Sequence, residues 1–197
     1  MTGTTLAYST DVSHVVGSLI ESTRRHDGYT AEHSIRTSRV AHDIATTMGF
    51  SSEAVEQVHV AALLHDIGKI GVPRSVLHKS GGLDQAEQAL VRLHPILGAS
   101  ILSTIDELRE FAPYVMHHHE RFDGNGYPNG LSGSEIPIES RIILVADAFD
   151  AMTTDRHYSY AATEDYAVSE LHLWAGRQFD PSAVEALLHI LSGRAAL

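Results

Sequence analysis

Histidine and aspartate residues recur in this sequence at positions suited to binding divalent metal ions. The chain has 14 histidines among 197 residues. His65 and Asp66 stand side by side shortly before Gly68, and near a helix end two neighbouring side chains can converge on one point. Imidazole and carboxylate together suit a borderline ion such as iron, nickel, zinc or manganese. Such a pair is also frequent at ordinary capped helix ends, so by itself it does not define a site.

Further candidate ligands accompany the pair and favour a metal centre. His33 lies on a predicted helix face together with Arg36. Asp147 interrupts an apolar run, where a buried carboxylate is costly unless it is paired or metal-bound, and Asp150 follows one helical turn later. The chain has 14 Lys and Arg against 25 Asp and Glu, so a metal is the favoured partner. The remaining candidates are His94, His118 and His119.

The composition excludes several classes of protein. With 43% hydrophobic and 20% charged residues it is typical of a globular domain. The absence of cysteine excludes disulfides, thiolate metal sites and a cysteine nucleophile. A net charge of −11 argues against binding to nucleic acid polymers or anionic membranes. No basic signal-peptide region precedes Arg24, and no apolar run approaches the ~20 residues of a membrane span. We expect a cytoplasmic protein without membrane segments.

The spacing of apolar residues predicts helices along almost the whole chain. The run Ile142–Val145 has the β-branched residues of a buried strand, but no second candidate strand could pair with it, so a helix is favoured. We therefore predict an all-α fold with an N-terminal helix or extension over 1–25 and a catalytic domain over 26–197. The expected helices cover 12–20, 30–48 with Thr30 as N-cap and Gly49 as stop, 51–68, 84–93, 95–105, 111–120, 136–152, 162–174 and 181–191.

Six motifs resemble those of the HD-GYP family, which belongs to the HD superfamily of metal-dependent phosphohydrolases. The resemblance covers about residues 25–190. It implies a helical bundle with a metal centre in its core and a Gly-Tyr-Pro loop at the mouth. It also implies hydrolysis of cyclic di-GMP to the linear dinucleotide pGpG, to GMP or to both, through a hydroxide that bridges two metal ions. The motifs are Asp27 to His33, His65-Asp66-Ile-Gly-Lys69, His94-Pro95, His118 to Pro128, Asp147 to Arg156, and Phe179-Asp180-Pro181.

The resemblance also implies a role for each matching residue. Family members with three metals tend to carry a glutamate at the position of Tyr29, so we expect two divalent ions, with Fe or Mn favoured over Ni, Co or Zn. The spacing to Glu120 leaves His117 outside the ligand set. The implied ligands are His33, His65, Asp66, His94, His118, His119 and Asp147. The implied catalytic residues are Asp66 as the bridging carboxylate, Lys69, and Asp27 as a proton donor. The implied substrate-binding residues are Lys69, Gly126, Tyr127, Pro128, Asp150 and Arg156, the last as a phosphate clamp.

The sequence departs from the family pattern at Ser159. The family usually has Lys or Arg at this position, so Ser159 removes a positive charge that helps to hold the second phosphate.

Two alternative functions stay open. They are a cyclic-dinucleotide receptor without turnover and a phosphodiesterase for the hybrid cyclic GMP-AMP. Residues 1–25 can supply only one helix, so we expect regulation by a separate regulatory or diguanylate cyclase protein, unless the sequence is a piece of a longer chain. The oligomeric state is open, a homodimer being one alternative.

Overall fold

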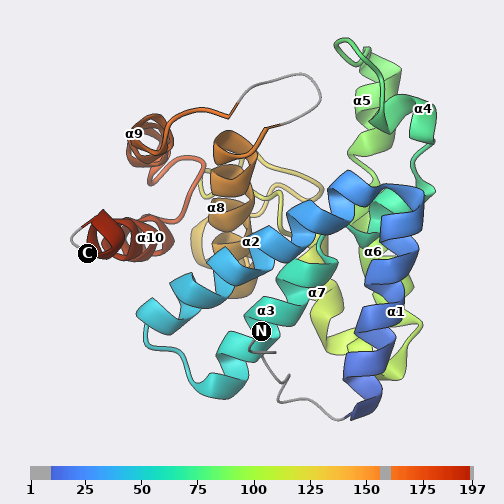
Figure 1. Cartoon of the computed structure of the whole chain (residues 1–197), viewed down its shortest axis with the longest axis horizontal. Helices are drawn as coiled ribbons and strands as arrows, with labels where there is room; N and C mark the ends of the chain where they lie inside the picture. The colour runs from blue at the N-terminus through green and yellow to red at the C-terminus, as the bar shows by residue number, and fades with distance from the viewer. Residues whose placement is uncertain (1–9, 156–160, 196–197) are drawn as a thin grey trace.

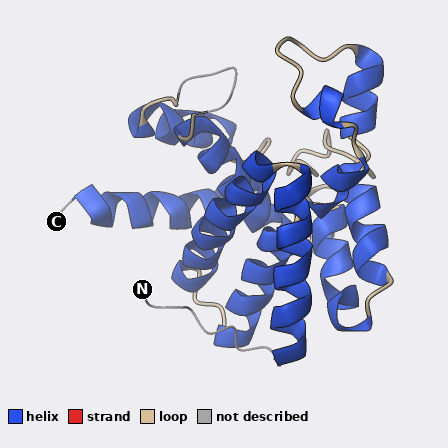
Figure 2. Ribbon diagram, turned by 45° about the vertical axis from the view of Figure 1, so that its right-hand side comes forward, coloured by secondary structure: helices blue, strands red, loops and turns tan. Residues whose placement is uncertain are grey.

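Capping residues and helix breakers account for where the helices begin and end. The computed structural model describes residues 10–155 and 161–195. In these ranges the chain consists of helices joined by loops, as Figures 1 and 2 show, and the predicted all-α fold is confirmed. The helices are α1 (Thr10–His26), α2 (Gly28–Thr47), α3 (Ser52–Leu64), α4 (Arg74–Leu77), α5 (Gln85–Val91), α6 (His94–Ser103), α7 (Ala112–Met116), α8 (Ile138–Thr153), α9 (Glu164–Trp174) and α10 (Pro181–Ala195), with 3-10 turns at Ile67–Gly71, Asp106–Phe111 and Gly133–Glu135.

The start of α2 differs from the prediction. Asp27, and not Thr30, is the N-cap. Its backbone is extended, and its carboxylate accepts hydrogen bonds from the Tyr29 N–H at 3.1 Å and the Thr30 hydroxyl at 2.6 Å. Aspartate serves as an N-cap because it satisfies helix-start N–H groups that have no partner within the helix. The predicted stop is confirmed, since α2 ends at Thr47 and Gly49 has a φ of 80°.

Two helices are shorter than predicted for the same reason. α3 ends at Leu64 instead of reaching Gly68, and α7 ends at Met116 instead of Glu120. At each end a histidine Nδ1 takes the backbone carbonyl that the next helical N–H would use. His65 donates to Ala62 O at 2.7 Å and His118 donates to Val115 O at 2.6 Å. The helices therefore stop where their histidines turn inward.

The apolar run in the second half of the chain forms the helix α8, as predicted. Its residues Ile142, Ile143 and Val145 have no exposed surface. α8 packs against α2 and α3, and α2 crosses α3 at the centre of the molecule in Figure 1. α6 packs against α7 and the 67–71 turn, while α10 lies across α2. The buried core draws residues from α1, α2, α3, α6, α7, α8, α9 and α10.

α1 belongs to the same packed unit. Val12 and Val16 are buried in the core, and the helix packs against α2. The boundary at residue 25 stays a prediction. None of the helices in the described ranges has both the length and the apolar character needed to cross a membrane.

Two glycines allow the backbones of α6 and the 67–71 turn to touch. A Cβ on Gly68 would lie 2.0 Å from His94 O and 2.5 Å from the Gly98 N atom. Both contacts are with backbone, which cannot rotate away as a side chain can. This close approach sets the distance between Asp66, just before the turn, and His94, at the start of α6.

Gly68→Ala is expected to destabilise the protein by about 2 kcal/mol or more, because overpacking against rigid backbone forces the turn and α6 apart. Thermal or urea unfolding measures the change. Gly81→Ala is the matched control, since a Cβ there meets nothing within 4 Å. Equal stability of the two variants would contradict the close packing described here.

Candidate metal centre

Three buried histidines share one local geometry. In each, the ring Nδ1 donates to the backbone carbonyl three residues earlier, so Nδ1 carries the proton and the Nε2 lone pair faces inward. A second partner of this kind fixes the tautomer and orientation of metal-binding histidines. The bonds are His65 to Ala62 O at 2.7 Å, His94 to Val91 O at 2.7 Å and His118 to Val115 O at 2.6 Å.

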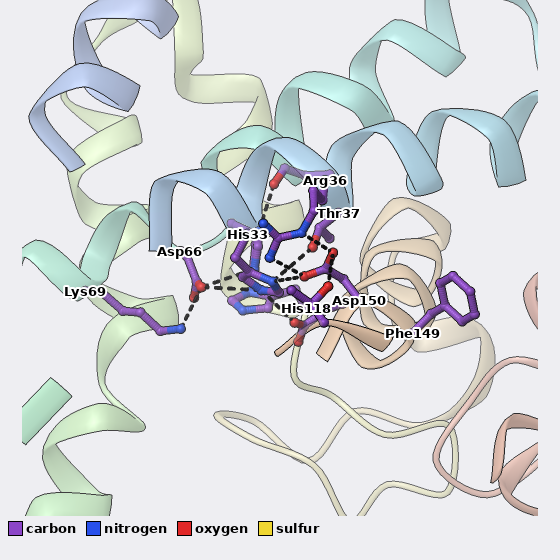
Figure 3. Close-up of polar contacts among 12 residues, drawn as sticks. His33, Arg36, Thr37, Asp66, Lys69, His118, Phe149 and Asp150 are labelled. Carbon is purple, nitrogen blue, oxygen red and sulfur yellow. Dashed lines mark hydrogen bonds and ion pairs between the residues drawn. The ribbon is translucent and has the colours of Figure 1, made fainter. Parts of the chain in front are cut away.

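Asp66 lies between two groups of candidate ligands. Its Oδ2 is 3.4 Å from His65 Nε2, and its Oδ1 is 3.2 Å from His94 Nε2. Figure 3 shows its carboxylate pointing into the cluster. Because each oxygen faces a different group, this carboxylate has the geometry of a bridging ligand. The two groups, within each of which the ligand atoms lie no more than 4.8 Å apart, are His33, His65 and Asp66, and His94, His118 and His119.

Asp147 completes the predicted set from α8. Its Oδ1 is 3.0 Å from His33 Nε2. All seven residues implied as ligands therefore surround one volume, and they come from α2, α6, α8 and the turns after α3 and α7. His117 belongs to neither group. Glu32 makes an ion pair with Arg24 at 3.0 Å and supplies no ligand to either group. Mixed imidazole and carboxylate donors of this kind fit divalent transition metals.

Four of the candidate ligands have pKa values that suit metal binding at neutral pH. Burial lowers the pKa of His94 to about 3 and that of His119 to about 4. Burial, reinforced by the neighbouring histidines, likewise holds the pKa of His118 well below its usual range. Burial opposes ionisation of Asp66, but Lys69 and His65 outweigh it and hold its pKa well below the ordinary value. At neutral pH these groups are neutral imidazoles and a carboxylate, the forms that bind metals.

The metal-free protein is expected to lose stability as the pH falls from 7 to 5. Folded His94 stays neutral down to about pH 3, whereas in the unfolded chain it binds a proton below about 6.5. The unfolded state therefore gains protons first, which costs the folded state roughly 1.4 kcal/mol per pH unit for each such histidine. His118 adds to the effect in the same direction. Urea unfolding of chelator-treated protein at both pH values measures it, and equal stability would contradict the burial of neutral histidines.

Asp150 and Arg36 orient the imidazole ring of His33 from its Nδ1 side. Its Nδ1 donates to Asp150 Oδ2 at 2.7 Å, and Arg36 binds the same carboxylate through Nε at 2.7 Å and through its second nitrogen at 3.0 Å (Figure 3). Burial disfavours the charged imidazole, but Asp147 and Asp150 outweigh it and raise the pKa of His33 to about 9. Asp150 was predicted to bind substrate. The structure places it behind His33 instead, with both oxygens occupied.

A cavity of about 360 Å³ opens onto the ligand cluster. Lys69 lines it and its Nζ lies 2.6 Å from Asp66 Oδ2. Asp27 lines it as well, with His78 Nε2 3.4 Å away. Burial disfavours ionisation of Asp27, but bonds from Thr30 and Tyr29 outweigh it and lower its pKa. Asp27 is therefore ionised at neutral pH, which differs from the proton-donor role implied by the resemblance.

The loop over 123–130 forms one wall of the cavity through Tyr127. This ring stacks on His119 with centroids 4.9 Å apart. Gly126 allows close packing, because a Cβ there would lie 2.3 Å from the Arg121 N atom, and its contact with substrate stays a prediction. The Tyr127–Pro128 peptide bond is cis. Arg156, the predicted phosphate clamp, and Ser159 lie outside the described residues.

Glu120 was not identified as a functional residue from the sequence, yet it holds this loop in place. Its carboxylate is buried and accepts the backbone N–H groups of Asn129, Gly130 and Leu131 at 2.6–3.2 Å. A buried carboxylate that accepts several N–H bonds can fix a loop without a charged partner. In the sequence, the indication of this role is an acidic residue shortly before the segment 124–130, which is rich in Gly and Pro.

Comparison with known proteins gives a consistent family assignment. A family model described as HD domain matches residues 14–183. The chain is 44% identical over 173 residues to the cyclic di-GMP phosphodiesterase response regulator RpfG of Xanthomonas campestris, covering 87% of this chain and 45% of that protein. It is 40% identical over 166 residues to a cyclic di-GMP phosphodiesterase of Thermotoga maritima, covering 83% and 45%. It is 35% identical over 182 residues to the 3′3′-cGAMP-specific phosphodiesterase 2 of Vibrio cholerae, covering 91% and 34%.

Solved structures share the fold. A cyclic GMP-AMP-specific phosphodiesterase of V. cholerae superposes with a TM-score of 0.69 at 21% identity, over 91% of this chain and 48% of that one. The HD domain of the L. monocytogenes phosphodiesterase PgpH gives 0.64 at 16% identity, over 90% and 98%. With the paired His65 and Asp66 at the centre of its ligand cluster, the chain belongs to the HD domain family. It spans less than half the length of the three curated relatives named above.

Proposed function

We propose that this chain is a metal-dependent phosphodiesterase that hydrolyses cyclic di-GMP to pGpG, GMP or both. The observation that carries the proposal is the placement of Asp66, with one oxygen toward each of two ligand groups. This arrangement fits two divalent ions, with Fe or Mn favoured, as the sequence predicts. Such ions, when bound, lower the pKa of bound water and polarise phosphoryl oxygens. The relatives named as cyclic di-GMP phosphodiesterases support the choice of substrate.

The chain's own residues supply the remaining parts of the reaction. In hydrolysis, a water oxygen adds to phosphorus, the bond from phosphorus to one ribose oxygen breaks, and that oxygen takes a proton. Lys69 faces the cavity beside Asp66, where its ammonium can stabilise charge on the phosphoryl group or the departing oxygen. Asp150 and Arg36 hold the imidazole of His33 in place. Tyr127 gives the cavity an aromatic wall.

Two alternative functions can be distinguished from cyclic di-GMP hydrolysis by experiment. The relative from V. cholerae named for 3′3′-cGAMP favours a phosphodiesterase for the hybrid cyclic dinucleotide as the second candidate. A receptor without turnover is less favoured, because every implied ligand is present in the sequence. We also propose a separate regulatory protein as a partner.

Product analysis tests the function. The purified protein is incubated with cyclic di-GMP or cyclic GMP-AMP, with Mn(II) or Fe(II) supplied or with a chelator, and the products are resolved by chromatography. We expect pGpG or GMP from cyclic di-GMP, and no product with the chelator. Cleavage of cyclic GMP-AMP alone would support the second candidate, and binding of cyclic di-GMP without any product would support the receptor.

A further inference from the structure

Arg92 is a cation beside Tyr127, one of the residues that line the cavity. It follows α5 directly, and its guanidinium carbon lies 4.6 Å from the centre of the Tyr127 ring. Its side chain is exposed, and among the residues that the structure describes no carboxylate forms an ion pair with it. Tyr127 in turn stacks on His119. A metal ligand, an aromatic ring and a guanidinium group therefore follow one another from the centre outward.

The stacking leaves the hydrogen-bonding edge of Arg92 available. A guanidinium group has five N–H donors, and its attraction to the face of an aromatic ring leaves donors for other partners. These donors match two oxygens of a phosphate group. Lys69, by contrast, is already engaged by Asp66 at 2.6 Å. Arg92 is thus prepared to bind an anion next to the cavity.

Contacts on both sides fix the backbone around Arg92. Asp84 and Glu87 form a reciprocal cap at the start of α5, and Lys79 contacts Glu87 at 2.6 Å. On the other side, Val91 O accepts the bond from His94. In Figure 1 the segment that carries α4 and α5 stands out from the main helical body. Arg92 lies where this segment joins α6.

The cavity is small, so part of a large substrate must lie outside it, near Arg92. A volume of about 360 Å³ is at the low end for ligand sites. A cyclic dinucleotide carries two phosphodiester groups on opposite sides of its ring. When one lies at the ligand cluster, the other must lie farther out, and Arg92 beside Tyr127 offers a cation there.

We propose that Arg92 is a substrate-binding residue that contacts the second, uncleaved phosphate of a cyclic dinucleotide. This inference rests on the proposed function and adds a residue that sets the preference for substrates with two phosphates. Arg92 should contact the uncleaved phosphate equally strongly in the bound substrate and in the transition state. Loss of such a contact raises KM and leaves kcat nearly the same.

The experiment compares two substrates that differ in the number of phosphates. Cyclic di-GMP has two, and bis(p-nitrophenyl) phosphate has one. For Arg92→Gln we expect the KM for cyclic di-GMP to rise about tenfold or more, on the scale of a charge-assisted hydrogen bond, with the larger effect at low salt. The KM for bis(p-nitrophenyl) phosphate should shift at least fivefold less than that for cyclic di-GMP. Arg92→Lys should recover part of the loss, since it restores the charge but not the planar fork.

Arg74→Gln is the matched control. Arg74 is also exposed, lies on α4 in the same projecting segment and has no acidic partner among the described residues. Arg74→Gln should leave the KM values for both substrates unchanged. A purely structural role of Arg92 would instead lower metal content or shift both substrates alike, and either result would overturn the proposal.

A third measurement separates this proposal from the proposed function. Inhibition of bis(p-nitrophenyl) phosphate hydrolysis by cyclic di-GMP reports binding whether or not cyclic di-GMP is cleaved. If the parent protein is inhibited but forms no pGpG or GMP, the proposed function fails, and a weaker inhibition of Arg92→Gln still supports the role of Arg92. Equal inhibition of parent and variant would overturn it.

Discussion

Asp66→Asn is expected to lower kcat for cyclic di-GMP by at least about 10³-fold and to reduce the bound metal. The neutral amide has the size of the carboxylate but loses its charge and one of its two acceptor oxygens. It therefore cannot serve both ligand groups, which the carboxylate faces at 3.4 Å through Oδ2 and 3.2 Å through Oδ1. Steady-state kinetics and elemental analysis measure the two effects.

A loss of fold must be separated from a loss of chemistry in this variant. Because asparagine matches aspartate in volume, the circular dichroism spectrum should stay that of a helical protein. Asp106→Asn is the matched control, since the Asp106 side chain is 85% exposed and pairs with the exposed Arg109. Full activity of Asp66→Asn with a normal metal content would exclude Asp66 as the bridging ligand.

Asp150→Asn is expected to weaken metal binding by about 10- to 100-fold, the usual effect of removing a group that orients a histidine ligand. Asp150 contacts His33 Nδ1 at 2.7 Å and is itself held by Arg36. The amide can still accept the bond from His33, but it removes the negative charge that orients this ring. The ring is then held less firmly toward the centre.

A metal titration distinguishes this positioning role from substrate binding. Saturating metal should restore most of the activity of Asp150→Asn, and KM should change little. Asp165→Asn, an exposed acid in the first turn of α9, is the control and should behave as the parent. A raised KM that saturating metal does not lower would instead support the substrate-binding role predicted from the sequence.

The all-α fold could be predicted from the sequence because apolar spacing is a local pattern, whereas the ligand set followed from the resemblance of six motifs to those of a known family. Apolar spacing places α8, and the carboxylate of Asp147 within that apolar helix indicates a buried partner. The exact ends of the helices are less predictable. α3 and α7 stop early because His65 and His118 each take a backbone carbonyl, and nothing in the residue types alone shows this competition.

Contacts between segments far apart in the sequence are harder to predict. Asp150 and His33 are separated by 117 residues, and only the packing of α8 on α2 brings them together. Gly126 occurs in a motif that suggests substrate contact, yet its neighbours show that the glycine is needed for close backbone packing. Arg92 lies between motifs, and its stacking on Tyr127 appears only once α5 and the loop over 123–130 are placed side by side.

The central claim, a centre for two metal ions bridged by Asp66, is tested most directly by locating the metals. Crystals of the full chain grown with Mn(II) allow the ions to be found by anomalous scattering. We predict two peaks, one beside His33 and His65 and the other beside His94 and His118, with Asp66 between them. A single peak, or two peaks that do not share Asp66, would contradict the account.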